Sequence, residues 1–420
     1  MPPLGRGGER AQVLAVMAFT DFLKSGHKPT LLCAFLYSDM SFMVWVLLGP
    51  LAIHIGRDLG LSVEQQYVMV AIPLLAGALL RIPVGILVDR FGPMRTGLLN
   101  QLLVIVVMFL AYQGELRSVG GIYLLAAALG VAGTSMAVAL PLTSRWYPDE
   151  YQGLALGVAG AASSGTVLAA LFAPALAEAY GWETVLGLAL IPLTLTFLVY
   201  LLLAKDSPRQ PEPQKLGRYL KIMADPDTWW FMLLYATAFG GVIALASILV
   251  LYFHQQYQLT PVTAGYFTAA CVLAGSALRP VGGWLADHWG GIRSMQVFFT
   301  TVLISLVLVG LTPASGVITM ALLMLAMAAL GMASGAVFQL VPLRFRREVG
   351  ATTGMVGAAG GLGGFLLAQI LGQSKVLSGD FQAGFFMFAG LAVLCLLGIR
   401  RVKSRWRTTW GAGEVTSARV

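Results

Sequence analysis

Two segments of the sequence repeat each other and decide the fold. The first reads Arg81-Ile-Pro-Val-Gly85-Ile-Leu-Val-Asp89-Arg90-Phe-Gly92-Pro-Met-Arg95, and the second reads Arg279-Pro-Val-Gly-Gly283-Trp-Leu-Ala-Asp287-His288-Trp-Gly290-Gly-Ile-Arg293. Two arginines, two glycines and one aspartate of the first segment each recur 198 positions later in the second: 81/279, 85/283, 89/287, 92/290 and 95/293. Five matched positions at a single offset indicate a duplicated structural unit.

The composition around these segments is that of a membrane protein. Of the 420 residues, 58% are hydrophobic and only 11% are charged, and the mean hydropathy is +0.80. A soluble domain carries roughly 25% charged residues, so a very apolar soluble protein is disfavoured. The net charge of +8 resides in short loops between apolar runs, and we therefore expect no nucleic acid partner.

Apolar runs of the length that a membrane requires fill most of the chain. A spanning helix needs about 20 mostly apolar residues. The runs predict twelve such helices, near 31–56, 66–88, 97–113, 120–143, 152–176, 183–204, 229–253, 262–286, 294–312, 316–341, 350–373 and 382–400. Residues 11–23 resemble a short signal segment, but Asp21 interrupts them and no cleavage-site pattern follows, so we interpret them as an interfacial segment or a lead.

The longest polar stretch, residues 205–227, divides the chain into two halves. The predicted parts are a cytoplasmic lead (1–28), an N-terminal six-helix bundle (29–204), a cytoplasmic linker (205–227), a C-terminal six-helix bundle (228–402) and a cytoplasmic tail (403–420). A second repeat agrees, since three glycines recur 197 positions later: Gly153, Gly157 and Gly160 as Gly350, Gly354 and Gly357. Because six is even, matching helices run in the same direction, and parallel six-helix halves around a central pathway are typical of the major facilitator fold.

The distribution of basic residues predicts the orientation. Most of the 27 lysines and arginines fall on the side of the two termini and the linker, and outside the spans only Arg57, Arg117 and Lys375 fall on the other side. The positive-inside rule then places both termini and the linker in the cytoplasm. We expect a multi-pass protein of the cytoplasmic (inner) membrane that acts as a monomer.

Arg81 and Arg279 are predicted to lie deep in the membrane. Each precedes its aspartate by eight positions, which is about 12 Å along a helix and places it near the middle of a hydrocarbon core roughly 30 Å thick. An arginine at that depth needs a counter-charge, and Asp39 is the only acid clearly inside a predicted span, nearer its cytoplasmic end. The simplest partner is an anionic substrate, and the guanidinium fork matches a planar oxyanion.

The sequence predicts no cofactor and no metal centre. Cys33, Cys271 and Cys395 all lie in apolar runs without CxxC spacing, and none of the four histidines pairs with another at i, i+4. The glycine-rich string at 350–364 superficially resembles a nucleotide-binding loop, but no strand precedes it. No catalytic constellation is apparent, so we do not expect an enzyme.

The chain resembles the nitrate/nitrite porter family of the major facilitator superfamily over roughly residues 30–400. Four segments carry the resemblance: Ser41-Phe-Met-Val-Trp45-Val-Leu-Leu-Gly49, Gly77-Ala-Leu-Leu-Arg81-Ile-Pro83, Gly335-Ala-Val-Phe-Gln339-Leu-Val-Pro342 and the glycine string Gly350–Gly364, which is similar to the family's nitrate signature. The resemblance implies a secondary carrier of nitrate or nitrite. Another small-anion carrier, or an anion receptor without net transport, are the alternatives.

The resemblance also implies site residues. Arg81 and Arg279 would bind the anion, the hydroxyl of Tyr235 would donate to it, and the ring of Phe239 would pack against its face; ordinary helix packing is the alternative for these two aromatic residues. Three glycines would allow close backbone approach along the substrate path: Gly160, Gly357 and Gly360. The chain departs from the family at three places, with Ser163 for an asparagine, Met136 for a phenylalanine, and Gly331-Met-Ala-Ser334-Gly335 for Gly-Asn-Gly.

Two further roles are expected. The loop motif resembles that of the superfamily and predicts a tight cytoplasmic turn, with Asp89 paired to a nearby base, that steadies one conformation; its residues are Gly85, Asp89, Arg90, Gly92 and Arg95 in the first half, with Asp287 and Arg293 in the second. Asp39 is the candidate for coupling to protons. Exchange of the anion for nitrite, or an Asp39 that only pairs with a base or caps local polar groups, are the alternatives.

Overall fold

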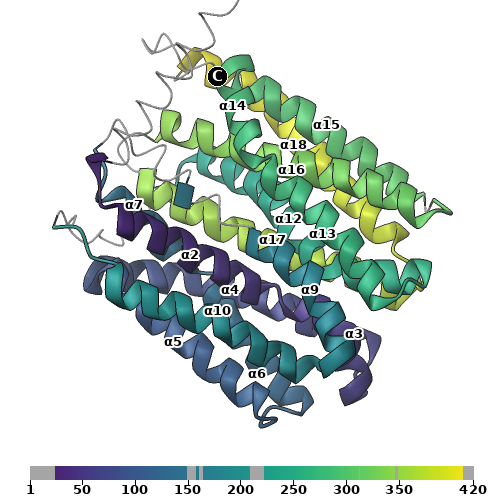
Figure 1. Ribbon diagram of the computed structural model, residues 1–420. Helices are drawn as coiled ribbons and strands as arrows, with labels where there is room; N and C mark the ends of the chain where they lie inside the picture. The colour runs from purple at the N-terminus through teal and green to yellow at the C-terminus, as the bar shows by residue number, and fades with distance from the viewer. Residues whose placement is uncertain are drawn as a thin grey trace, which may run out of the picture.

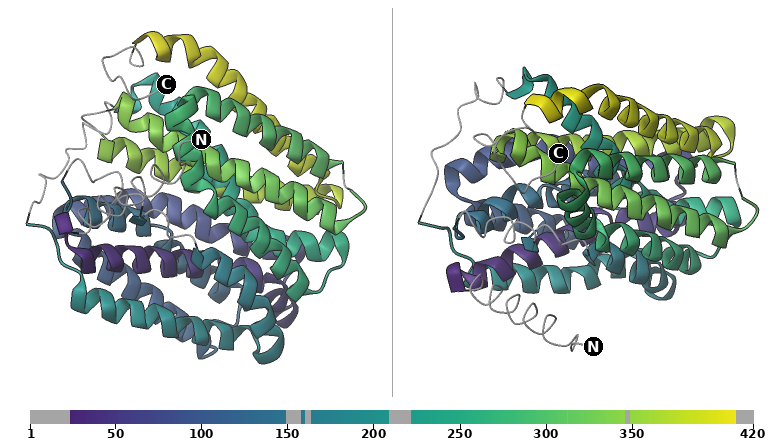
Figure 2. Two further views of the ribbon diagram at one scale, coloured as in Figure 1. Left: turned by 45° about the horizontal axis from the view of Figure 1, so that its top comes forward. Right: turned by 90° about the horizontal axis from the view of Figure 1, so that it is seen from above.

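The computed structural model describes residues 24–148, 158–159, 164–208, 222–311, 313–345 and 349–409, the side chains of 349–351 and 409 excepted. Every regular element among these residues is a helix. The helices form two bundles, which are separate in colour and position in Figure 1. Figure 2 shows that the helices run roughly side by side along the long axis of both bundles.

The N-terminal bundle holds eight described helical segments. They are α2 (Lys28–Trp45), α3 (Leu48–Leu59), α4 (Val63–Phe91), α5 (Pro93–Tyr112), α6 (Val119–Ala132), α7 (Ser135–Ser144), α9 (Ser164–Tyr180) and α10 (Trp182–Leu203). The C-terminal bundle holds α12 (Pro226–Tyr257), α13 (Pro261–Ala277), α14 (Arg279–Trp289), α15 (Gly291–Gly310), α16 (Gly316–Arg344), α17 (Val349–Ser378) and α18 (Gln382–Thr409).

These segments match the predicted spans. Eleven described helices, with α2–α3, α6–α7 and α13–α14 each taken as one, are long and apolar enough to cross a membrane, and α9 is a shorter apolar helix at the place of the fifth span. We call the end of the bundles beside Leu203 and Pro226 the linker end. The opposite end, at Leu59 and Tyr257, is the far end.

Three spans that the sequence predicts as continuous are interrupted. Pro280 cannot donate to the carbonyl of Ser276 and its ring crowds that oxygen, so α13 ends at Ala277 and α14 begins at Arg279. Pro50 acts in the same way between α2 and α3, where Gly49 N bonds Val46 O at 3.0 Å in a tighter i→i+3 turn. The third interruption lies at Gly133, between α6 and α7.

The two bundles meet along several pairs of helices. α4 packs against α17 and α9 packs against α13 (Figure 1), and α3 packs against α12. The approach of α17 to α4 is close, since a Cβ added at Gly361 would lie 3.0 Å from the Cβ of Ala78. Small residues permit such contact between helices in a membrane. The central region between the bundles therefore holds the side chains of α4, α12, α14, α16 and α17.

Candidate anion site between the bundles

Arg81 lies buried on α4 and bonds to both bundles. The whole residue is only 6% exposed. Nη2 donates to the carbonyl of Gly133 in the N-terminal bundle at 2.7 Å, and Nη1 donates to the carbonyl of Gly357 on α17 of the C-terminal bundle. Nε is also buried, and it has no hydrogen-bond partner among the described residues. The guanidinium therefore has donor capacity that the described protein groups do not fill.

The backbone around Arg81 is shaped to receive it. At the interruption between α6 and α7, Ala137 N donates to Thr134 O at 2.8 Å in an i→i−3 turn, so the carbonyl of Gly133 is free to accept from the guanidinium. On the other side, a Cβ added at Gly357 would lie 3.0 Å from Nη1 of Arg81. A glycine at this position lets the arginine reach the α17 backbone.

Arg279 approaches the same region from the C-terminal bundle. It begins α14 directly after the interruption that Pro280 imposes. Its Nη2 donates to Oη of Tyr235 at 3.1 Å, and its guanidinium carbon lies 5.5 Å from the ring centre of Phe239 and 5.8 Å from that of Phe338. These distances are within the range of cation–π attraction. Aromatic side chains thus hold Arg279 without neutralising it.

Three aromatic rings form one wall of the site. Tyr235 and Phe239 lie one turn apart on α12 and stack at 5.1 Å with an interplanar angle of 7°. Phe338 on α16 meets Tyr235 at 4.6 Å. Phe338 was not among the site residues predicted from the sequence, although it is the one aromatic residue in the segment Gly335–Pro342 that carries the family resemblance.

Gly360 makes room for this wall. A Cβ added there would lie 2.7 Å from Cε1 of Tyr235 and 2.9 Å from Cδ1 of Phe239. At these distances both rings would have to shift, in a place where α17 packs against α12. Two of the three predicted site glycines, Gly357 and Gly360, therefore border the arginine and the rings respectively.

The site is positively charged. Arg81 lies within electrostatic reach of both Arg279 and Tyr235. Among the described residues, no carboxylate forms an ion pair with either arginine. Two guanidinium groups, one from each bundle, with an aromatic wall beside them can bind a small planar anion through charge-assisted hydrogen bonds.

Asp39 bonds to α9 and forms no hydrogen bond with Arg81 or Arg279 in the part of the chain that the structure describes. Its buried carboxylate accepts from Oγ of Ser164 at 2.9 Å and from the backbone N of Gly165 at 2.8 Å. It therefore anchors the first described turn of α9 to α2, as a carboxylate at a helix start does. Among the described residues it has no basic partner.

The remaining predicted substrate residues are less closely involved or not described. Met136 on α7 is half-buried and packs against the main apolar core. Gly160 and Ser163 lie outside the described residues. Among the described residues, no group of His, Cys, Asp or Glu could hold a metal ion.

The first copy of the loop motif forms a tight turn at the linker end. Asp89 pairs with Arg145 at 2.9 Å. Gly92 has a φ of +87°, which favours glycine, and a Cβ there would lie 2.6 Å from Oδ2 of Asp206. Asp206 Oδ1 also accepts from Met94 N at 2.9 Å at the start of α5. The segment after α10 is thereby fastened to the loop.

The other motif residues are less constrained. An added Cβ at Gly85 would meet nothing within 4 Å, and Arg90 lies 5.6 Å over the ring of its neighbour Phe91. Arg95 is exposed, as are Asp287 and Arg293 of the second copy. Neither Asp287 nor Arg293 forms an ion pair within the part of the chain that the structure describes.

Comparisons with known proteins agree with this architecture. The family model of the Major Facilitator Superfamily matches residues 30–368. The chain is 33% identical to a probable nitrate/nitrite transporter NarK2 of Mycobacterium tuberculosis, over 88% of this chain and 95% of that protein. It is 30% identical to a nitrite extrusion protein of Bacillus subtilis, over 84% of this chain and 88% of that protein.

Two further comparisons extend this result. A probable nitrate/nitrite antiporter NarK1 of Thermus thermophilus is 32% identical, over 85% of this chain and 87% of that protein. Among solved structures, the human organic anion transporter MFSD10 matches with a TM-score of 0.66 at 15% identity, covering 89% of this chain and 99% of that one. At that identity the likeness supports the fold alone.

Proposed function

The chain belongs to the nitrate/nitrite porter family of the Major Facilitator Superfamily, and on that basis we propose that it moves nitrate, nitrite or both across the membrane by alternating access. In this proposal the anion binds between Arg81 and Arg279. The carrying observation is the pair of guanidinium groups, one from each bundle, with no carboxylate paired to either among the described residues.

Charge and shape together favour a small planar oxyanion. The unused donor at Nε of Arg81 and the donors of Arg279 can each offer hydrogen bonds to an oxygen. The stacked rings of Tyr235 and Phe239 offer a flat surface beside them. A monovalent anion between the two guanidinium groups would offset one of the two positive charges in a region of low dielectric, where an unpaired charge is costly.

The contacts between the bundles support alternating access. Oη of Tyr67, at the far end of α4, donates to Oε1 of Gln255 on α12 at 2.8 Å, and its ring meets Phe381 edge-on at 6.3 Å. A Cβ added at Gly372 would lie 2.7 Å from the Tyr67 ring. The described side-chain contacts between the bundles extend from the level of Arg81 to this end, which is the arrangement expected of a carrier closed at the far end.

The orientation of the chain in the membrane is part of the proposal. Basic residues gather at the linker end, and the positive-inside rule would place the linker and both termini in the cytoplasm. The far end would then face away from the cytoplasm. A monovalent anion entering against a negative-inside potential must be driven, since each charge costs about 2.3 kcal/mol per 100 mV. Exchange for internal nitrite and cotransport with protons both satisfy that requirement.

Uptake into proteoliposomes tests the proposal. The protein is reconstituted and labelled nitrate is added outside, with internal nitrite in one set of vesicles and a pH gradient in another. We expect saturable uptake in at least one set, little competition by chloride or phosphate, and loss of uptake in Arg81→Ala and Arg279→Ala variants that remain folded. Nitrate binding without flux in either set would point to a receptor, and near-normal uptake in either alanine variant would contradict the site.

A further inference from the structure

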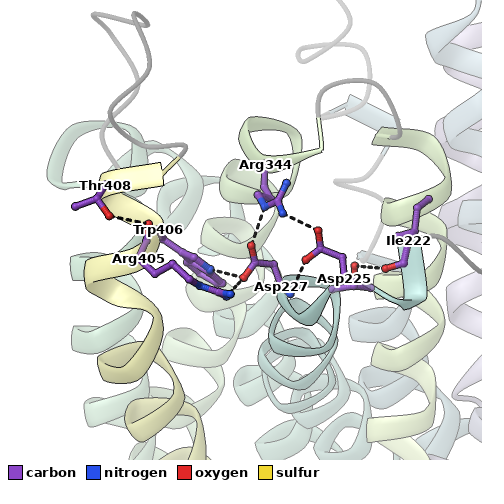
Figure 3. Close-up of polar contacts among 8 residues, drawn as sticks. Ile222, Asp225, Asp227, Arg344, Arg405, Trp406 and Thr408 are labelled. Carbon is purple, nitrogen blue, oxygen red and sulfur yellow. Dashed lines mark hydrogen bonds and ion pairs between the residues drawn. The ribbon is translucent and has the colours of Figure 1, made fainter.

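A carboxylate is buried at the linker end of the C-terminal bundle. Asp227 is the second residue of α12, and its side chain is 5% exposed. It accepts from Nε of Arg344 at 2.7 Å and from Nε1 of Trp406 at 2.7 Å, and Nη2 of Arg405 also donates to it (Figure 3). The donors come from the end of α16 and the last turns of α18. One carboxylate thus joins the ends of three helices.

A second acid completes the cluster. Asp225 caps α12, because its Oδ1 accepts from the backbone N of Asp227 at 2.8 Å. Its Oδ2 accepts from Nη2 of Arg344 at 2.6 Å, so that Arg344 bridges both acids (Figure 3). We call these five residues the α12 clamp: Asp225, Asp227, Arg344, Arg405 and Trp406. A buried carboxylate with three donors is fixed in place much more firmly than a surface ion pair.

The N-terminal half does not repeat the clamp. At the offset of 198 the position of Asp227 corresponds to Pro29, and that of Arg405 corresponds to Ser207, whose hydroxyl donates to the carbonyl of Arg145 at 2.6 Å. In the first half, Arg145 at the end of α7 pairs with the motif acid Asp89. The fold duplication therefore does not by itself require a clamp at this place.

In the second half an arginine at the same end of its bundle bonds to other acids. Arg344 at the end of α16 bonds Asp225 and Asp227, and the motif acid Asp287 is exposed without an ion pair among the described residues. In the first half Arg145 holds the acid of the loop motif, whereas in the second half Arg344 holds the start of α12.

The clamp lies on the two helices that carry the aromatic wall. Tyr235 follows Asp227 by eight residues on α12, about 12 Å along the helix, and Phe338 precedes Arg344 by six residues on α16, about 9 Å. Midway, Phe231 of α12 stacks on the ring of Trp406 at 4.7 Å with an interplanar angle of 20°. A shift of α12 against α16 would separate Tyr235 from Phe338, and both rings face Arg279.

We propose that Asp227 is a positioning residue for anion binding: the α12 clamp fixes the register of α12 against α16, and so holds Tyr235 and Phe338 on Arg279. The last turns of α18 are then a functional part of the transporter. This inference rests on the proposed function, because it names nitrate as the ligand whose affinity the clamp sets.

Three variants of the full-length, detergent-purified protein test the proposal. Asp227→Asn removes the charge that binds both arginines. Trp406→Phe keeps a smaller ring against Phe231 and removes the donation from Nε1 without changing any charge, so it remains informative if the first variant does not fold. Arg407→Gln is the matched control, because Arg407 is exposed on the same turns of α18. The measurements are nitrate and nitrite affinities by calorimetry and the unfolding temperature without ligand.

We expect Asp227→Asn to bind nitrate about tenfold more weakly, which is about 1.4 kcal/mol. Trp406→Phe should show a smaller loss in the same direction, the nitrate-to-nitrite affinity ratio should change in both, and Arg407→Gln should match the parent. If both clamp variants unfold at lower temperature but bind both anions with parental affinity, the clamp is only structural and the proposal is wrong. If the parent protein itself binds no nitrate, the proposed function fails, and the positioning role fails with it.

Discussion

Replacing Arg81 by lysine separates the effect of charge from the effect of the guanidinium fork. The variant keeps one positive charge at the same buried place. In the structure, Nη1 and Nη2 donate to carbonyls of opposite bundles, at Gly357 and Gly133, while Nε has no partner among the described residues. The single ammonium nitrogen of lysine cannot donate to both carbonyls and to an anion in the fixed directions that the planar guanidinium group provides.

The size of the effect follows from the bonds at stake. A hydrogen bond to a charged group contributes about 1.5–3 kcal/mol. If lysine loses one such bond to the anion, nitrate affinity should fall about 10- to 100-fold, because each 1.4 kcal/mol is a factor of ten. Attraction between point charges alone would be retained, so a site that works only by charge would bind lysine and arginine variants almost equally.

The assay is nitrate binding by calorimetry, together with the initial rate of labelled nitrate uptake into vesicles. The control is Arg117→Lys, an arginine-to-lysine change at a half-exposed residue of the same bundle that pairs with Asp58 and Glu183 at the far end. We expect parental binding in the control. Nitrate affinity of Arg81→Lys within about threefold of the parent, below one lost hydrogen bond, would refute bidentate recognition by this arginine.

Three other changes have definite expected outcomes. Gly360→Ala should weaken nitrate binding several-fold while the protein stays folded, because the added Cβ would lie 2.7 Å from Cε1 of Tyr235 and displace that ring. Parental nitrate affinity in this variant would show that the position of the ring is not important. Asp39→Asn should abolish any uptake that depends on an imposed pH gradient, since it removes the buried carboxylate that accepts from Gly165 N at the start of α9. An unaffected pH profile, or a parent that needs no pH gradient, would favour exchange with nitrite. Cysteines at positions 67 and 255, joined by a bifunctional thiol cross-linker that spans the length of the two original side chains, should stop uptake, because the Tyr67 hydroxyl and the Gln255 amide oxygen meet across the far end at 2.8 Å; a cross-linked protein that still transports would contradict closure at this contact.

Several features of the site could be predicted from local sequence. The duplication follows from the 198-position offset, and counting residues along a helix from a charged loop predicts a deep position for Arg81 and Arg279. Asp89 was expected to pair with a base, and it pairs with Arg145. The expectation that the two arginines lack carboxylate partners depended only on how few acidic residues the apolar runs contain.

Other features could not be read from these local patterns. Phe338 lies in a quoted segment, but no periodic signal distinguishes a ring that faces Arg279 from one that faces lipid. The interruptions at Pro50, Gly133 and Pro280 were predicted as continuous helix, because a spanning run of apolar residues does not show where the backbone bonds change. The role of Asp39 as an anchor for α9 depends on Ser164 and Gly165, which are more than a hundred positions away.

The sequence by itself determined the apolar spans and the duplicated halves, and it predicted two arginines inside the spans. The spans depend on hydropathy and helical rise over about thirty residues, and the duplication is visible as one offset of 198 positions. Only the tertiary structure decided which groups those charges meet. Arg81 reaches Gly357 across 276 positions and Trp406 reaches Asp227 across 179, and both contacts depend on how each helix is rotated and where it is interrupted. Rotation of a helix about its axis is set by packing against its neighbours, and no segment carries that information alone.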